Sequence, residues 1–172
     1  QERALHATTS NDRSIGIEIA NIGAYPPDAV QPLERWYRRE EGAAGGVVLN
    51  VPEQIKSTGI LTPGFVGRPA RAERVSGAIH GQNLVQYDLT PEQYAALAKL
   101  AAALCEIFPR LRCEIPRDAE GEPMTRKLPD DELARYRGIL GHYHIQENKV
   151  DPGPAFQWER FLEEVERVRK GK

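Results

Sequence analysis

The sequence predicts a single domain of the α/β class, because one segment has the period of a strand and two others have the period of helices. Residues 14–21 place an isoleucine at every second position, and a period of two is typical of a strand. Apolar residues recur at helical spacing over residues 97–108 and again over residues 156–168. With 172 residues, the chain is long enough to bury one hydrophobic core.

A long insertion containing many prolines and glycines, residues 23–77, follows the predicted strand. Within it, residues 32–41 are predicted to form a short helix whose Trp36 and Tyr37 pack inward. The rest of the insertion is predicted to be ordered loop. A loop of this length in a compact domain is usually functional, or else it contains elements that the sequence pattern does not reveal.

A hairpin and then a helix are predicted for residues 78–108. The hairpin occupies residues 78–89, with its turn near residues 81–83. Thr90 can cap a helix, Pro91 suits the first helical position, and Gln93 completes a capping box. Pro109 ends this helix. The residues expected on its buried face are Leu97, Leu100, Ala101, Leu104 and Phe108.

The C-terminal third is predicted to alternate short elements with loops. A loop covers residues 116–129, a short helix residues 130–136, and a short buried strand residues 138–142. An irregular polar loop follows, and a last helix starts near Pro154. The apolar residues of this last segment are Phe156, Trp158, Phe161, Leu162, Val165 and Val168.

Composition excludes several classes of protein. The net charge of −2 gives no general attraction to nucleic acid or to an anionic membrane. No apolar run approaches the roughly 20 residues that span a bilayer, so no transmembrane segment is expected. The first residues, Gln1 to Arg3, have no apolar run behind them and do not resemble a signal peptide.

The two cysteines are too few for a disulfide scaffold or a thiolate zinc site. Cys105 lies on the predicted helix and Cys113 in the segment after it. Two buried free thiols are the favoured interpretation. A single disulfide between Cys105 and Cys113 remains the alternative interpretation if the protein is exported.

His142 and Asp151 are the candidate metal ligands. His142 ends the predicted strand 138–142, and Asp151 lies nine residues later on a loop that Pro152 and Pro154 restrict. An imidazole and a carboxylate are suitable ligands for Zn²⁺. For an isolated pair at this spacing, however, a structural contact is the commoner explanation.

The segment around this pair, GHYHIQENKVDPGPAFQW (residues 141–158), resembles the closing motif of a known enzyme family. The upstream segment HATTSNDRSIGIEIAN (residues 6–21) is similar to a second motif of the same family, in the same order. The family is that of the zinc-dependent N-acetylmuramoyl-L-alanine amidases and the related peptidoglycan recognition proteins. The resemblance covers most of the chain, from about Leu5 to Phe161.

This resemblance implies a fold, a cofactor and a reaction. It implies that His142 and Asp151 bind Zn²⁺ and that Glu18 and Lys149 act in catalysis. The reaction would be hydrolysis of the amide between N-acetylmuramic acid and L-alanine in peptidoglycan or muropeptides, in a periplasmic or secreted protein of the cell envelope. The implied fold is a central mixed sheet flanked by helices, with the zinc site at the strand ends.

The sequence departs from the family in three respects. The spacing from His142 to Asp151 is one residue shorter, and the loop 146–148 differs from the family loop. The family takes its first zinc histidine from a strand that precedes the residue 6–21 motif, so this chain would hold the C-terminal majority of the domain. The remaining histidines, His6, His80 and His144, are not expected to replace that ligand. Two protein ligands are thus expected where a catalytic zinc site normally has three.

Three functions remain open. The first is the amidase. The second is a module that binds muropeptides without cutting them, since some peptidoglycan recognition proteins lose a zinc ligand. The third is a non-catalytic structural or interaction domain that uses the insertion, residues 23–77, as its contact surface. An insertion that covers the cleft would support this third function. If the preceding strand is missing, the strand 14–21 should have an exposed edge.

Overall fold

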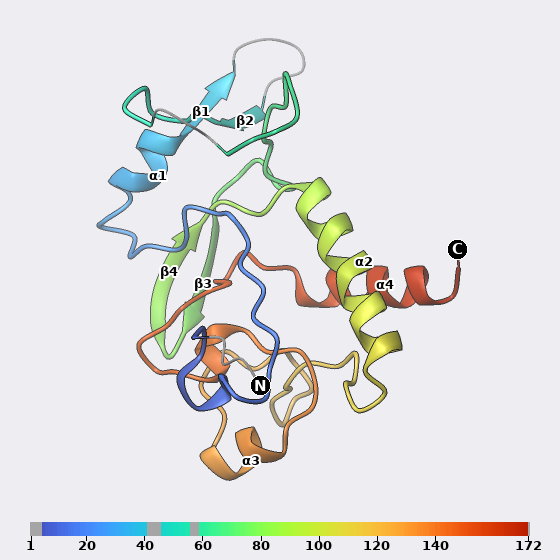
Figure 1. Cartoon of the computed structure of the whole chain (residues 1–172). Coiled ribbons are helices and arrows are strands. Elements are labelled where there is room, and N and C mark those ends of the chain that lie inside the picture. Colours follow the sequence, from blue (N-terminus) through green and yellow to red (C-terminus); the bar gives the residue numbers. More distant parts are fainter. Residues whose placement is uncertain (1–4, 41–45, 56–58, 172) are drawn as a thin grey trace.

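The computed structural model describes residues 5–40, 46–55 and 59–171 (Figure 1). The chain start at residues 1–3, where no signal peptide is predicted, lies outside these residues. The helices are η1 (Thr8–Ser10), α1 (Gln31–Trp36), α2 (Pro91–Ile107), α3 (Asp130–Arg135), η2 (His142–His144) and α4 (Trp158–Arg169). The strands are β1 (Tyr37–Glu40), β2 (Gly46–Leu49), β3 (Val75–Ile79) and β4 (Gln82–Gln86).

The strands form two separate antiparallel pairs, β1 with β2 and β3 with β4. The α/β class is therefore confirmed, but the expectation of a central mixed sheet is wrong for the described residues. The predicted hairpin is present, with its turn at His80 and Gly81, one residue earlier than expected. Both turn residues have positive φ, 53° and 75°, as a two-residue hairpin turn requires.

The predicted strand at residues 14–21 is absent. Among the described residues, no strand pairs with this segment, and the side chains of Ile15 and Ile17 are 55% and 43% exposed. Only Ile19 packs against the main core. A period of two shows which side chains share a face, but a strand also needs a hydrogen-bonding neighbour.

Helix α2 begins as predicted. The Thr90 side chain accepts a hydrogen bond from the Gln93 amide at 3.2 Å, and the Gln93 side chain accepts one from the Thr90 amide at 2.9 Å. The expected buried face is confirmed in part: Ala101 is buried and Leu97 packs against the main core, whereas Leu100 and Phe108 are 44% and 47% exposed. The buried residues are Tyr94, Ala98, Ala101, Ala102 and Cys105.

The small residues on this face allow α4 to approach α2 closely, and Figure 1 shows the two helices crossing. From α4, Phe161 and Val165 fill the space above the alanines and are each 1% exposed. Large residues on one helix thus meet small residues on the other, which is how close packing is reached without voids. The expectation of apolar contacts from the last helix is confirmed, although α4 starts at Trp158 rather than near Pro154.

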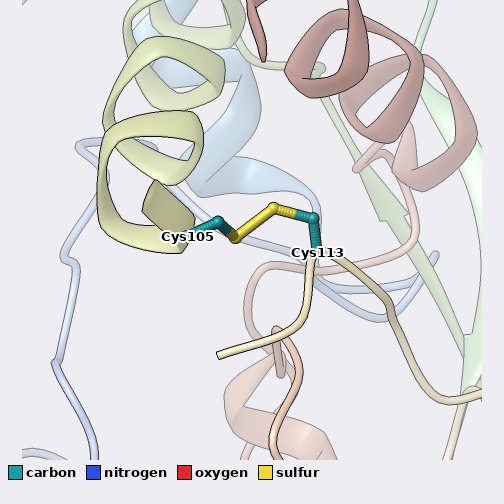
Figure 2. Close-up of a disulfide and its surroundings, with 2 residues drawn as sticks. All are labelled: Cys105 and Cys113. Atoms are coloured by element: carbon teal, nitrogen blue, oxygen red, sulfur yellow. A yellow bond between two sulfur atoms is a disulfide. The ribbon is translucent and has the colours of Figure 1, made fainter. Parts of the chain in front are cut away.

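Cys105 and Cys113 form a disulfide with an S–S distance of 2.09 Å (Figure 2). The prediction of two free thiols is therefore wrong. The chain reverses immediately after α2, where the Leu111 amide donates to the Phe108 carbonyl at 2.8 Å. This turn brings the two Cα atoms to 6.4 Å, within the range that a disulfide can bridge.

The predicted short helix at residues 130–136 is confirmed as α3, but the predicted strand at residues 138–142 is not formed. The Ile139 amide donates to the Glu114 carbonyl and the Arg112 amide to the Arg137 carbonyl, each at 2.8 Å. These two bonds do not continue as a ladder. The chain instead turns into η2, so His142 begins a 3₁₀ turn rather than ending a strand.

The insertion contains α1, β1 and β2 and is more regular than predicted. The expected helix at residues 32–41 stops at Trp36, and Tyr37 to Glu40 form β1. Leu33, Val47 and Tyr87 form a small core of their own. Figure 1 places β1 and β2 at the top, at the far end of the β3–β4 pair from its His80–Gly81 turn. No helix among the described residues is long and apolar enough to cross a membrane.

Candidate metal site

His142 and Asp151 lie side by side on the surface. Nδ1 of His142 is 3.1 Å from Oδ2 of Asp151, and the two side chains are 20% and 62% exposed. The backbone brings them together, since the Tyr143 amide donates to the Asp151 carbonyl at 3.3 Å. Pro152 packs so closely on Gly141 that a Cβ at Gly141 would lie 2.7 Å from the proline Cδ.

Gln146 fixes the orientation of the imidazole. Its Oε1 is 2.7 Å from Nε2 of His142, and its Nε2 donates to Oδ1 of Asn148 at 3.4 Å. An amide oxygen can only accept, so Nε2 of His142 carries the proton. In the neutral ring, the lone pair of Nδ1 then faces the Asp151 carboxylate. Two acceptors at this distance need a proton or a cation between them.

The spacing of these two atoms fits a metal ion. Ligands bonded to Zn²⁺ at about 2.0–2.1 Å in tetrahedral geometry are separated by roughly 3.3 Å. The observed 3.1 Å between Nδ1 and Oδ2 is close to that edge length. Over the described ranges, no group of three or more His, Cys, Asp and Glu side chains could hold a metal ion. A metal ion between His142 and Asp151 would therefore find two candidate ligands in the described part of the chain, rather than a full set.

Lys149 and Glu18 are placed differently relative to the pair. Two contacts hold the Lys149 backbone. Its amide donates a hydrogen bond to the Gln146 carbonyl at 3.2 Å, and Nε2 of His80 lies 3.1 Å from the Lys149 carbonyl. Its half-buried side chain belongs to the same loop as Asp151. Glu18 is exposed and, in the described parts of the chain, forms no hydrogen bond or ion pair with His142, Lys149 or Asp151.

His144 and His6 have contacts of their own. His144 is 1% exposed, accepts a bond from the Gly141 amide at Nδ1 and donates from Nε2 to the Met124 carbonyl, both at 2.8 Å. Burial lowers the pKa of His144 to about 4. His6 lies over Gly16, with Nε2 2.8 Å from the Ser14 hydroxyl.

A buried polar network around Asp88 is not among the features predicted from the sequence. The Asp88 carboxylate accepts hydrogen bonds from the Leu89 amide at 2.8 Å and from the Tyr94 hydroxyl, Arg71 Nε and Gln157 Nε2 at 2.7 Å each. Burial raises the pKa of Tyr94, as does its hydrogen bond to Asp88, so the hydroxyl remains a donor. The network joins the end of the insertion, the start of α2 and the start of α4.

One signal in the sequence could have revealed this network. Leu84, Gln86 and Asp88 occupy alternate positions of the predicted hairpin, and a period of two puts them on one face. Leu84 marks that face as buried, and all three residues are at most 2% exposed. Polar residues on the buried face of a strand need hydrogen-bonding partners inside the protein.

The chain matches no protein-family model, no curated protein and no solved structure.

Proposed function

We propose that this protein is a zinc-dependent N-acetylmuramoyl-L-alanine amidase that acts on peptidoglycan or muropeptides. The observation that carries the proposal is the convergence of His142 Nδ1 and Asp151 Oδ2 at 3.1 Å, with Gln146 directing the Nδ1 lone pair at the carboxylate. Both residues belong to the motif on which the resemblance rests. A proton between the two atoms would account for the same distance, so it is the motif that favours a metal ion at this position.

The residues of the chain have separate parts in this mechanism. Zn²⁺, when bound, lowers the pKa of a water molecule to about 7 and polarises a carbonyl group. His142 and Asp151 would hold the ion, and a third donor would have to come from outside the described residues. Lys149 would stabilise negative charge on the amide oxygen, and Glu18 would move a proton from water to the leaving amine.

The disulfide supports a location in the cell envelope. Disulfides persist in oxidising compartments such as the periplasm and are rare in the cytosol of mesophiles. The Cys105–Cys113 bond therefore favours a periplasmic or secreted protein over a cytoplasmic one.

The proposal is tested on the natural full-length protein. We expect about one zinc per chain by elemental analysis and release of peptides beginning with L-alanine from muropeptides by mass spectrometry. His142→Ala and Asp151→Ala should abolish both, because each removes a ligand. Asp131→Ala, an exposed carboxylate on α3, is the matched control and should change neither.

Two results would contradict the amidase. One is a metal-free protein that still releases peptide, and the other is a protein that neither binds zinc nor cuts muropeptides. A muropeptide that binds in calorimetry without being cut would identify the second candidate, the non-catalytic binding module. That candidate is favoured by one observation, namely that the described residues supply only two ligands.

The third possibility, an insertion that covers the site, has no support from the described residues. His80 at the turn of β3–β4 contacts the Lys149 carbonyl, whereas the β1–β2 pair lies at the opposite end of that hairpin (Figure 1). We therefore do not propose this function.

A further inference from the structure

Gln86, on strand β4, is buried to 1% exposure and uses every polar group of its carboxamide. Its Oε1 accepts from the Ala155 amide at 3.1 Å. Its Nε2 donates to the Pro152 carbonyl at 2.9 Å and to Oδ1 of Asn21 at 3.2 Å. The donors and acceptors match only one orientation of the amide, so the side chain is fixed.

Two glycines allow the Asp151 loop to lie directly on the β3–β4 pair. Gly153 has φ +90°, and a Cβ there would lie 2.2 Å from Oε1 of Gln86. A Cβ at Gly77 on β3 would lie 2.8 Å from Cβ of Pro154. Gln86 therefore bonds to a loop that the hairpin also holds by close packing.

Asn21 connects this contact to the segment that contains Glu18. Asn21 Oδ1 accepts from both Gln86 Nε2 and the Gly23 amide, the latter at 2.8 Å. The preceding carbonyl, that of Ala20, accepts from Gln93 Nε2 at 2.6 Å. The segment 20–23 is thus held by one side chain of α2 and by Gln86.

We infer that Gln86 is a positioning residue that holds the Asp151 loop and the segment following Glu18 in one fixed register. Its significance for catalysis rests on the proposed function, since Asp151 is a proposed ligand and Glu18 a proposed proton carrier. The register itself is a property of the metal-free protein. Outer residues that orient metal ligands typically contribute about 10–100-fold to metal affinity.

The first experiment uses the metal-free chain and the variant Gln86→Met, which keeps the length of the side chain and removes its hydrogen bonds. We expect faster amide hydrogen exchange at both Ala155 and Gly23, and a shift of the His142 ring ¹⁵N resonances in NMR spectra. Asn21→Ala should speed exchange at Gly23 and leave Ala155 and the His142 resonances as in the wild type.

Val48→Ala is the control for simple loss of stability. Val48 is 1% exposed on strand β2, within the insertion, so its truncation destabilises the protein without touching the Asp151 loop. It should leave exchange at Ala155 and Gly23 and the His142 resonances unchanged. If Gln86→Met does not fold, Gln86→Asn replaces it, because its shorter side chain keeps the polar carboxamide but is one methylene too short to reach Ala155, Pro152 and Asn21 together.

The second experiment measures zinc affinity by titration calorimetry. We expect Gln86→Met to weaken zinc binding by about 10–100-fold and Val48→Ala to bind as the wild type does. A wild-type protein that binds no zinc would refute the proposed function, and the exchange and NMR data would still decide the role of Gln86. The inference is overturned if the Gln86 variant matches the wild type at Ala155 and in the His142 resonances, or if Val48→Ala produces the same changes.

Discussion

At the candidate metal site, the family resemblance predicts which side chains to examine but not how they are supported. His142 and Asp151 were chosen from a motif, and the structure brings them together. Glu18 came from the same resemblance and is exposed without a bond to either residue. Gln146 was noted only as a departure from the family loop, although it sets the tautomer of His142. A residue that contacts a candidate ligand, as Gln146 does, is placed by the turns of the backbone, and these turns cannot be predicted from the spacing of residues in the sequence.

His144 provides a prediction about acid stability. Its pKa is about 4 in the folded protein, where burial disfavours the charged ring, and about 6.5 when unfolded. The contribution of neutral His144 to the free energy of unfolding is complete above pH 6.5. It is lost as the pH falls towards 4, because between these pH values only the unfolded state takes up a proton at His144. The loss should reach about 3 kcal/mol.

Denaturant unfolding at a series of pH values tests this prediction. His144→Gln removes the titrating group, so the variant should be less stable than the wild type at pH 7. The difference between them should shrink steadily between pH 6.5 and 4. A difference that stays constant with pH would contradict a buried neutral His144.

Elements with local signals were predicted well, whereas elements that depend on partners were not. The capping box at Thr90 lies within one turn of chain and fixes the start of α2. The segments 14–21 and 138–142 have strand-like sequences but no neighbouring strand among the described residues. Of the residues expected on the buried face of α2, Ala101 is buried but the leucines are not fully buried, because α4 packs on small residues that permit a closer approach.

The disulfide at the end of α2 should stabilise the protein measurably. It closes a loop with a sequence separation of 8, for which the chain-entropy model gives about 2.5 kcal/mol. The double variant Cys105→Ser with Cys113→Ser should lose that much in free energy of unfolding. A reductant should lower the stability of the wild type similarly and leave the variant unchanged. Equal unfolding midpoints for variant and oxidised wild type would refute this contribution.

For the whole molecule, the sequence predicted the α/β class but not the arrangement of its strands. Two short hairpins replace the expected mixed sheet, and the main core lies between β3–β4, α2 and α4. The buried carboxylate of Asp88 joins these parts through Arg71, Tyr94 and Gln157. Contacts between residues so distant in sequence follow from the fold and could not be predicted from composition or period.

Asp88→Asn should therefore destabilise the whole molecule. Both carboxylate oxygens accept hydrogen bonds, so in either orientation the new amide group would face donors and leave buried groups unpaired. The expected loss is about 3 kcal/mol in free energy of unfolding, measured with denaturant. Glu73→Gln, in the exposed pair with Arg39, is the matched control and should cause no measurable change. Similar losses in both variants would contradict the role of the network.

The insertion leaves and rejoins the rest of the protein at neighbouring points. Tyr25 bonds to Val85 through both backbone groups, and the Ala70 amide donates to the Leu89 carbonyl. The described residues between these anchors form a lobe that packs on Tyr87 in a small core. Such a lobe can grow, shrink or be exchanged during evolution while the surface carrying His142 keeps its shape.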